Sequence, residues 1–266
     1  MTDTRATSGP APVAARTAVL LPGTGSDAVF AEKAFGAEAR RRGLVPVAVD
    51  PDPRAVVDSY LAALGRAAAD GPIVVGGVSI GAAVALRWAF DHPERVVGVL
   101  AALPAWTGSP DDAPAAASAR WTASELRAHG LEAVTGAMTA SSPAWLAGEL
   151  GRSWRAQWPD LPSALDEAAR YRALDVEDLR GVTVPVGITA AVDDAVHPLG
   201  VGQQWAREIP RARLETVTLD RIGEDPGILG VRCFAALDEA ARAAALDEAA
   251  RAAALDEAAR AAGPIP

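Results

Sequence analysis

The sequence is short of several residue types that mark particular classes of protein. It has one cysteine, Cys233, which excludes a disulfide within the chain and is typical of a reducing compartment. It contains no asparagine, so it carries no N-glycosylation site, and Lys33 is its only lysine. With 34 acidic against 25 basic residues, the net charge of −9 disfavours nucleic acids and anionic membranes as partners.

Long apolar segments are absent too. The longest apolar run, near residues 96–105, is far shorter than the roughly 20 residues that span a bilayer. Residues 1–15 have no apolar core of the length found in signal peptides. One cysteine and three dispersed histidines give no metal-ligand spacing, and no cofactor is implied. We therefore expect a cytoplasmic protein without metal or cofactor, and no pattern specifies its oligomeric state.

Half of the 266 residues are apolar, and short apolar runs alternate with helical segments. The runs are continuously apolar, as in parallel strands that are covered on both faces, which predicts a doubly wound α/β fold. Strands are expected at 17–21, 44–49, 73–78, 96–103, 182–190 and 214–219. Helices are expected at 28–43, 53–69, 80–90 and 198–208, with a last one starting near Pro226.

The alternation defines the expected organisation of the chain. Residues 17–103 and 181–235 form the predicted core, while residues 104–180 have no strand candidate and hold five of the seven tryptophans. This middle stretch is predicted to be a helical insertion, and the polar residues 1–16 are predicted to be disordered.

Residues 236–266 contain most of a nine-residue repeat, Ala-Ala-Leu-Asp-Glu-Ala-Ala-Arg-Ala, whose three copies begin at Ala235, Ala244 and Ala253. The composition strongly favours helix. Nine residues turn a helix by about 900°, so successive leucines point to opposite sides and form no coiled-coil stripe. A solvated helical extension is expected.

The first candidate catalytic motif is Gly77-Val78-Ser79-Ile80-Gly81, which directly follows a predicted strand and opens a predicted helix. A serine at such a junction must turn sharply, and its glycine neighbours avoid collisions with the adjoining turn. The helix also points its free N–H groups at the serine, where they favour a developing negative charge. The alternative is a Gly/Ser-rich turn without chemistry.

Two further segments follow strands. Residues 21–27 read Leu-Pro-Gly-Thr-Gly-Ser-Asp and lack both the P-loop lysine and the dinucleotide glycine spacing, so phosphate binding ranks below an oxyanion loop. Residues 192–198 read Val-Asp-Asp-Ala-Val-His-Pro.

These three motifs resemble the α/β-hydrolase superfamily, and the resemblance covers about residues 17–235. It implies a mostly parallel sheet in which residues 104–180 form a helical cap. It also implies that Ser79 is the nucleophile, that Thr24 and Ile80 donate oxyanion-hole N–H groups, and that Asp194 is the acid. Asp193 is the near alternative for the acid, and both could instead cap the next helix.

The catalytic base is the point of departure from the family. The superfamily's histidine commonly follows the last strand, where this chain has Glu224. His197, three residues beyond Asp194, is the candidate for a displaced base, and Glu224 is a weaker one because a carboxylate must be buried to activate a serine. The alternative, without a catalytic role, is that His197 caps or packs against the start of the next helix. His92 and His129 are interpreted as solvated helix ends.

Two functions follow from these residues. The first is a serine hydrolase that cleaves an ester, thioester or amide of a small compound. A tryptophan-lined cap would favour an apolar one, although the tryptophans could also simply hold the insertion together. The second, suggested by Glu224, is a non-catalytic protein that keeps the pocket and binds a small ligand or a protein.

Overall fold

The computed structural model describes residues 15–261 and is built on one parallel sheet. The strand order is β2-β1-β3-β4-β5-β6, and every neighbouring pair is parallel. The strands are β1 (Thr17–Leu21), β2 (Val45–Ala48), β3 (Ile73–Val78), β4 (Val96–Ala102), β5 (Val186–Ala191) and β6 (Ala212–Val217). The predicted α/β class is confirmed. The sequence predicts disorder for residues 1–16, and residues 1–14 of that range lie outside the described part of the chain.

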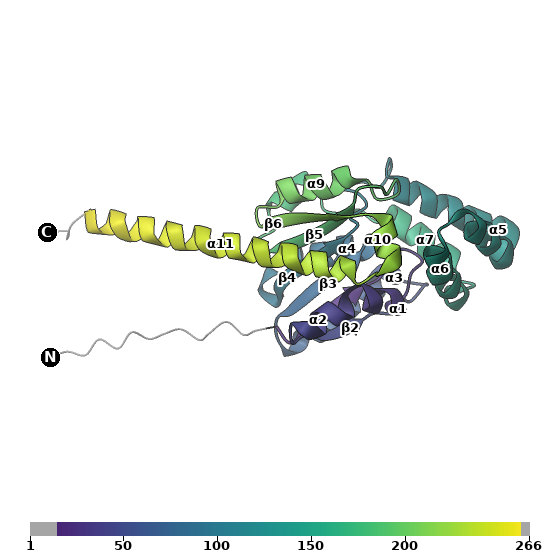
Figure 1. Cartoon of the computed structure of the whole chain (residues 1–266), viewed down its shortest axis with the longest axis horizontal. Coiled ribbons are helices and arrows are strands. Elements are labelled where there is room, and N and C mark those ends of the chain that lie inside the picture. The colour runs from purple at the N-terminus through teal and green to yellow at the C-terminus, as the bar shows by residue number, and fades with distance from the viewer. Residues whose placement is uncertain (1–14, 262–266) are drawn as a thin grey trace.

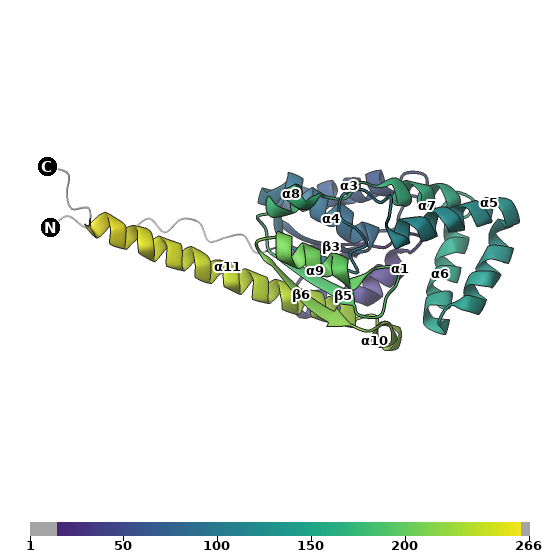
Figure 2. The ribbon, with the colours of Figure 1, turned by 90° about the horizontal axis from the view of Figure 1, so that it is seen from above.

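Helices cover both faces of the sheet (Figures 1 and 2). One face carries α1 (Ala28–Ala31), the π-helical turn η1 (Glu32–Gly36), α2 (Ala37–Arg41) and α11 (Ile228–Ala261). The other carries α3 (Val56–Ala67), α4 (Ile80–Asp91) and α9 (Leu199–Glu208). Alternate side chains of β1 serve the two faces, because Leu20 joins the buried cluster of Phe35 and Phe234 whereas Val19 joins that of Tyr60. Burial on both faces explains the continuous apolar runs.

The segment between β4 and β5 is helical throughout its regular part. Its helices are α5 (Pro114–Ser141), α6 (Ala144–Gln157), α7 (Leu161–Arg170) and α8 (Val176–Arg180). Helix α5 bends at Gly130, whose φ of 77° leaves the helical region. Helices α5 and α6 lie at the opposite end of the molecule from the free end of α11 (Figures 1 and 2).

Two features near the C-terminal side differ from the sequence-based expectation. A short helix, α10 (Leu219–Glu224), follows β6, and the Thr218 side chain caps it by accepting from Arg221 N–H. In addition, α11 runs without a break from Ile228 to Ala261, so the last core helix and the repeat form one element. Its first half packs on β4, β5 and β6. No helix within residues 15–261 is long and apolar enough to cross a membrane.

Candidate active site

Ser79 lies in the turn between β3 and α4 with a strained backbone. Its φ of 55° and ψ of −116° lie where side chains are rarely tolerated, and the residue is 5% exposed. The two glycines of the motif make this turn sterically feasible. A Cβ added at Gly81 would lie 2.4 Å from the carbonyl oxygen of Leu21, and one at Gly77 would lie 2.5 Å from the carbonyl carbon of Gly81.

His197 lies beside Ser79, although 118 positions separate the two residues in the chain. The distance from His197 Nε2 to Ser79 Oγ is 3.0 Å, and the distance from His197 Nδ1 to Asp194 Oδ2 is 2.8 Å. With the tautomer in which Nδ1 carries the proton, Nδ1–H donates to Asp194 and Nε2 accepts from the serine hydroxyl. The structure thus brings the three predicted residues into one hydrogen-bonded chain.

The loop that carries both Asp194 and His197 is ordered by its own side chain. Asp194 Oδ1 accepts from Val196 N–H at 2.8 Å and from His197 N–H at 3.1 Å. An aspartate that accepts from the backbone two and three residues ahead forms a tight turn. This turn aims the imidazole, and Pro198 then leads into α9.

The same contacts govern the charge of Asp194. Burial raises the pKa of its carboxyl, but the hydrogen bonds and charge of His197, together with the Val196 N–H, outweigh burial and leave the pKa below its ordinary value. Asp194 is therefore ionised at neutral pH, as an acid that orients a histidine must be.

The alternative residues lie elsewhere. Asp193 Oδ1 accepts from Leu219 N–H at 2.9 Å and so holds the start of α10. Glu224 ends α10 with its side chain 62% exposed and pairs with Arg221. Neither is among the hydrogen-bond partners of Ser79 or His197, and the exposure of Glu224 removes the burial that a carboxylate base requires.

The other two histidines are solvated helix residues, as their sequence context predicts. His92 follows the last turn of α4, where its ring lies 5.0 Å from that of Trp88. His129 pairs with Glu125 one turn earlier on α5, with its side chain 61% exposed.

Of the two predicted oxyanion donors, Ile80 directly follows Ser79, and Thr24 belongs to a loop that passes close to it. A Cβ built on Gly23 would lie 3.5 Å from Ser79 Cβ, so the loop at residues 22–27 passes directly over the serine. Thr24 is the next residue of that loop, and Ile80 is the first residue of α4, where an N–H has no carbonyl partner within the helix. The two segments that carry the predicted donors therefore both adjoin Ser79.

The five tryptophans of the insertion do not gather on one surface. Trp106 and Trp154 are buried in the core cluster that also contains Ile80, and Trp121 and Trp158 are exposed. Trp145 stacks on Phe30 with a centroid distance of 6.5 Å. At least two of them therefore hold the insertion to the body.

Three residues of α6 that no sequence motif marks also reach this region. Arg152, Ser153 and Gln157 hydrogen bond to the loop at residues 22–27. No local motif predicts such contacts, because they join segments more than 120 positions apart in the chain. Within residues 15–261 no group of three or more potential metal-ligating side chains is clustered.

Comparisons with known proteins identify the fold. No protein-family model matches the chain, and no curated protein matches its sequence. Solved structures do match. MenH from S. aureus is 14% identical with a TM-score of 0.64, over 86% of this chain and 96% of that one. A thermophilic esterase from Thermogutta terrifontis is 18% identical with a TM-score of 0.56, over 78% and 86% of the two chains.

An enol-lactonase from Burkholderia xenovorans is a third similar structure, with 16% identity, a TM-score of 0.58, and coverage of 77% of this chain and 83% of that one. At such identities the likeness concerns the arrangement of strands and helices. The comparisons therefore leave the chemistry to be argued from the site itself.

Proposed function

This chain has the fold of the α/β-hydrolase superfamily, and we propose that it is a serine hydrolase. It cleaves an ester, thioester or amide bond of a small apolar compound. One observation carries the proposal: His197 Nε2 lies 3.0 Å from Ser79 Oγ while its Nδ1 lies 2.8 Å from Asp194. A nucleophile, a base and an orienting acid in hydrogen-bond contact form the arrangement that nucleophilic acyl transfer requires.

In the proposed reaction, Ser79 Oγ attacks the substrate carbonyl carbon as His197 Nε2 takes the hydroxyl proton. The carbonyl oxygen becomes an oxyanion that accepts from the N–H groups of Thr24 and Ile80. His197 then protonates the leaving group, and an acyl-serine remains. Water attacks the acyl carbon with His197 again as base, and the proton returns to Ser79 as the acid product leaves. Asp194 holds the imidazole tautomer and stabilises its charged form.

Burial around Ser79 supports the proposed substrate class. Ser79 is 5% exposed, which favours a small acyl group, and Ile80 belongs to a buried cluster to which the insertion contributes Trp106 and Leu165. The solved esterase and lactonase with the same fold support the reaction type.

A fluorophosphonate probe tests the proposal, because it phosphonylates a serine that a base has activated. We expect one label per chain, lost in Ser79→Ala and retained in Ser141→Ala, since the Ser141 hydroxyl bonds only to its own helix. Absence of labelling between about pH 7 and 9, roughly the range above the ordinary histidine pKa, would refute the enzyme and favour a non-catalytic binding protein.

A further inference from the structure

Helix α6 of the insertion holds two consecutive carbonyl groups of the loop over Ser79. Ser153 Oγ donates to the carbonyl oxygen of Gly25 at 2.8 Å, and Gln157 Nε2 donates to that of Ser26 at 2.9 Å. Gln157 Nε2 also donates to Ser153 Oγ at 2.8 Å. Ser153 is 1% and Gln157 6% exposed, so water does not compete for these bonds.

A charged pair extends the same contact by one residue. Arg152 donates to both oxygens of Asp27, with Nη2 to Oδ1 at 2.8 Å and Nε to Oδ2 at 3.1 Å. Asp27 is buried and also caps α1 by accepting from Phe30 N–H at 3.1 Å. A bidentate ion pair of this kind fixes the relative orientation of the two side chains as well as the distance between them.

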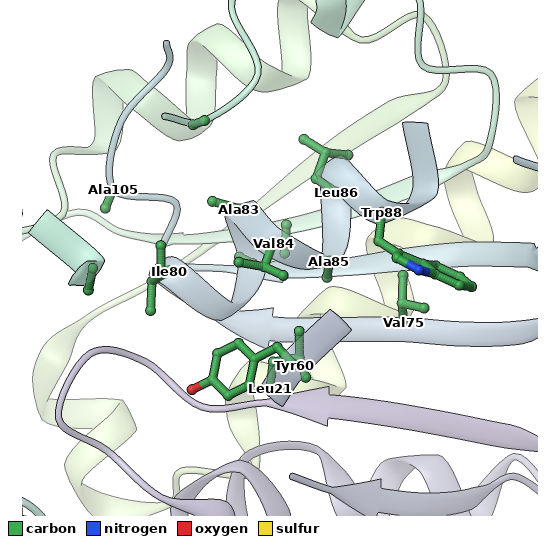
Figure 3. Close-up of a cluster of buried hydrophobic side chains, with 14 of the residues drawn as sticks. Leu21, Tyr60, Val75, Ile80, Ala83, Val84, Ala85, Leu86, Trp88 and Ala105 are labelled. Atoms are coloured by element: carbon green, nitrogen blue, oxygen red, sulfur yellow. The ribbon is translucent and has the colours of Figure 1, made fainter. Parts of the chain in front are cut away.

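The core holds the loop from the opposite side. The buried Tyr60 hydroxyl donates to the carbonyl oxygen of Pro22 at 3.0 Å, and Figure 3 shows that hydroxyl directed toward the loop that follows Leu21. On the α6 side, Gly25, with φ of 68°, lies against the indole of Trp154, and a Cβ added at Gly25 would lie 2.9 Å from Nε1. The loop therefore has contacts on both sides and little room to shift.

These contacts reach the oxyanion donor through one peptide plane. Ser26 N–H donates to the carbonyl oxygen of Gly23 at 3.0 Å. The Gly23 carbonyl and the Thr24 N–H belong to the same planar peptide unit, so fixing the direction of one fixes the other. Ser153 holds the Gly25 carbonyl, which shares a peptide unit with the Ser26 N–H, and that N–H holds the Gly23 carbonyl, so the plane of the Thr24 N–H is set. Gln157 holds the next carbonyl of the loop, that of Ser26.

We infer that Arg152, Ser153 and Gln157 are positioning residues, which act through the loop at residues 22–27 to aim the Thr24 N–H at the oxyanion. The inference rests on the proposed hydrolase function. It also makes α6 a fixed wall of the site, because α6 cannot lift away without releasing an oxyanion donor.

Two variants remove the contacts, and one provides a control on the same helix. Ser153→Ala/Gln157→Leu removes the buried donors, and Arg152→Gln removes the pair with Asp27. Arg155→Gln is the control, because the Arg155 side chain is 54% exposed and contacts Gly151 and Glu132 rather than the loop. Should the double variant fail to fold, Arg152→Gln keeps the test decisive because it changes a side chain that is 39% exposed.

The kinetic readout separates positioning from general packing. With a p-nitrophenyl ester we expect kcat to fall about 10- to 100-fold, as for a displacement of a catalytic group by about 1 Å, with KM changed less than about twofold. Affinity for phenylboronic acid, which forms a tetrahedral adduct with the serine, should fall in parallel with kcat. Folded variants with wild-type kcat, or with raised KM and unchanged kcat, would overturn the inference.

A second readout is independent of activity. Amide hydrogen exchange of the segment 22–27 should speed up in both variants and stay unchanged in Arg155→Gln. If the wild-type protein neither hydrolyses the ester nor takes the fluorophosphonate label, the proposed function fails, and the exchange data still decide whether α6 holds the loop. Unchanged exchange in both folded variants contradicts the inference whatever the activity.

Discussion

At the residue scale, the site shows how a histidine can serve a serine from an unexpected place in the chain. Asp194 and His197 lie on one loop after β5, three residues apart, and the aspartate bonds to both the backbone and the ring of the histidine. A local turn thus performs the orientation that otherwise needs two separate loops. The sequence named both residues and left Asp193 and Glu224 open, since only distances distinguish them.

The base is open to a direct test. His197→Ala should lower ester hydrolysis about 10³-fold or more, because His197 is the proposed acceptor of the serine proton and no other side chain within residues 15–261 is hydrogen bonded to Ser79 Oγ. Glu224→Gln should leave the rate within about twofold, since its exposed side chain pairs with Arg221. Steady-state kinetics on purified variants measures both. The assignment of His197 as base is wrong if His197→Ala keeps the wild-type rate while Glu224→Gln loses it.

Gly81 gives a prediction about stability. Gly81→Ala places a Cβ 2.4 Å from the Leu21 carbonyl oxygen, a backbone atom that cannot easily move, and we expect a loss of about 2–3 kcal/mol in the free energy of unfolding. Gly65→Ala in α3 is the matched control, with no atom within 4 Å of the new Cβ. It should stabilise by about 0.5–1 kcal/mol. Urea unfolding compares them, and equal effects would contradict the steric explanation.

At the element scale, most strands and helices follow from sequence pattern, with differences at their ends. The strand expected from Val182 begins at Val186, because Pro185 has no N–H to give to the ladder. Helix α10 was not predicted: its six residues are too few to show a periodic pattern, and Thr218 is its only start signal. Short elements of this kind are decided by what they pack against.

Helix α11 has two halves with different physical support. Leu237 and Ala244 are buried, whereas Leu246 and Leu255 are each 72% exposed. The packed half supplies the nucleus, and an alanine-rich segment then extends it at little further cost. Continuity with the core helix explains why a repeat with no apolar stripe is helical.

Truncation separates these halves. Deletion from Ala249 onward keeps the pair between Arg211 and Glu248. It should change the free energy of unfolding by less than about 0.5 kcal/mol. The helical signal in the far-ultraviolet circular dichroism spectrum should fall, because helical residues are removed. Leu237→Ala, by contrast, should cost about 2–3 kcal/mol, because that side chain packs against Gly98 and Gly187. A large loss on truncation would show that the outer half packs on the body.

At the scale of the whole molecule, the site forms where distant parts of the chain meet. The loop after β1, the turn after β3 and the loop after β5 converge beside Ser79, and α6 of the insertion closes over the first of them. In a parallel sheet the carboxyl ends of the strands share one edge, which brings such loops together. The insertion therefore contacts a loop that borders Ser79.

Stability of the whole molecule should depend on pH through Asp194. The pKa of its carboxyl is lowered in the folded state, so its contribution is present above about pH 4, the ordinary aspartate value, and is lost as pH falls through the folded pKa. The free energy of unfolding should thus drop more between pH 7 and pH 3 in the wild type than in Asp194→Asn. Urea titrations across that range measure the difference, and parallel curves would contradict it.

The sequence by itself determined the class of fold and the position of Ser79, because continuous apolar runs and a glycine-flanked turn are local patterns with local causes. It also placed Asp194 and His197 on one loop. Only the tertiary structure decided that His197 faces Ser79, that Glu224 does not, and that α6 holds the loop at residues 22–27. The contacts of His197 and of α6 join residues more than a hundred positions apart, which no local pattern encodes.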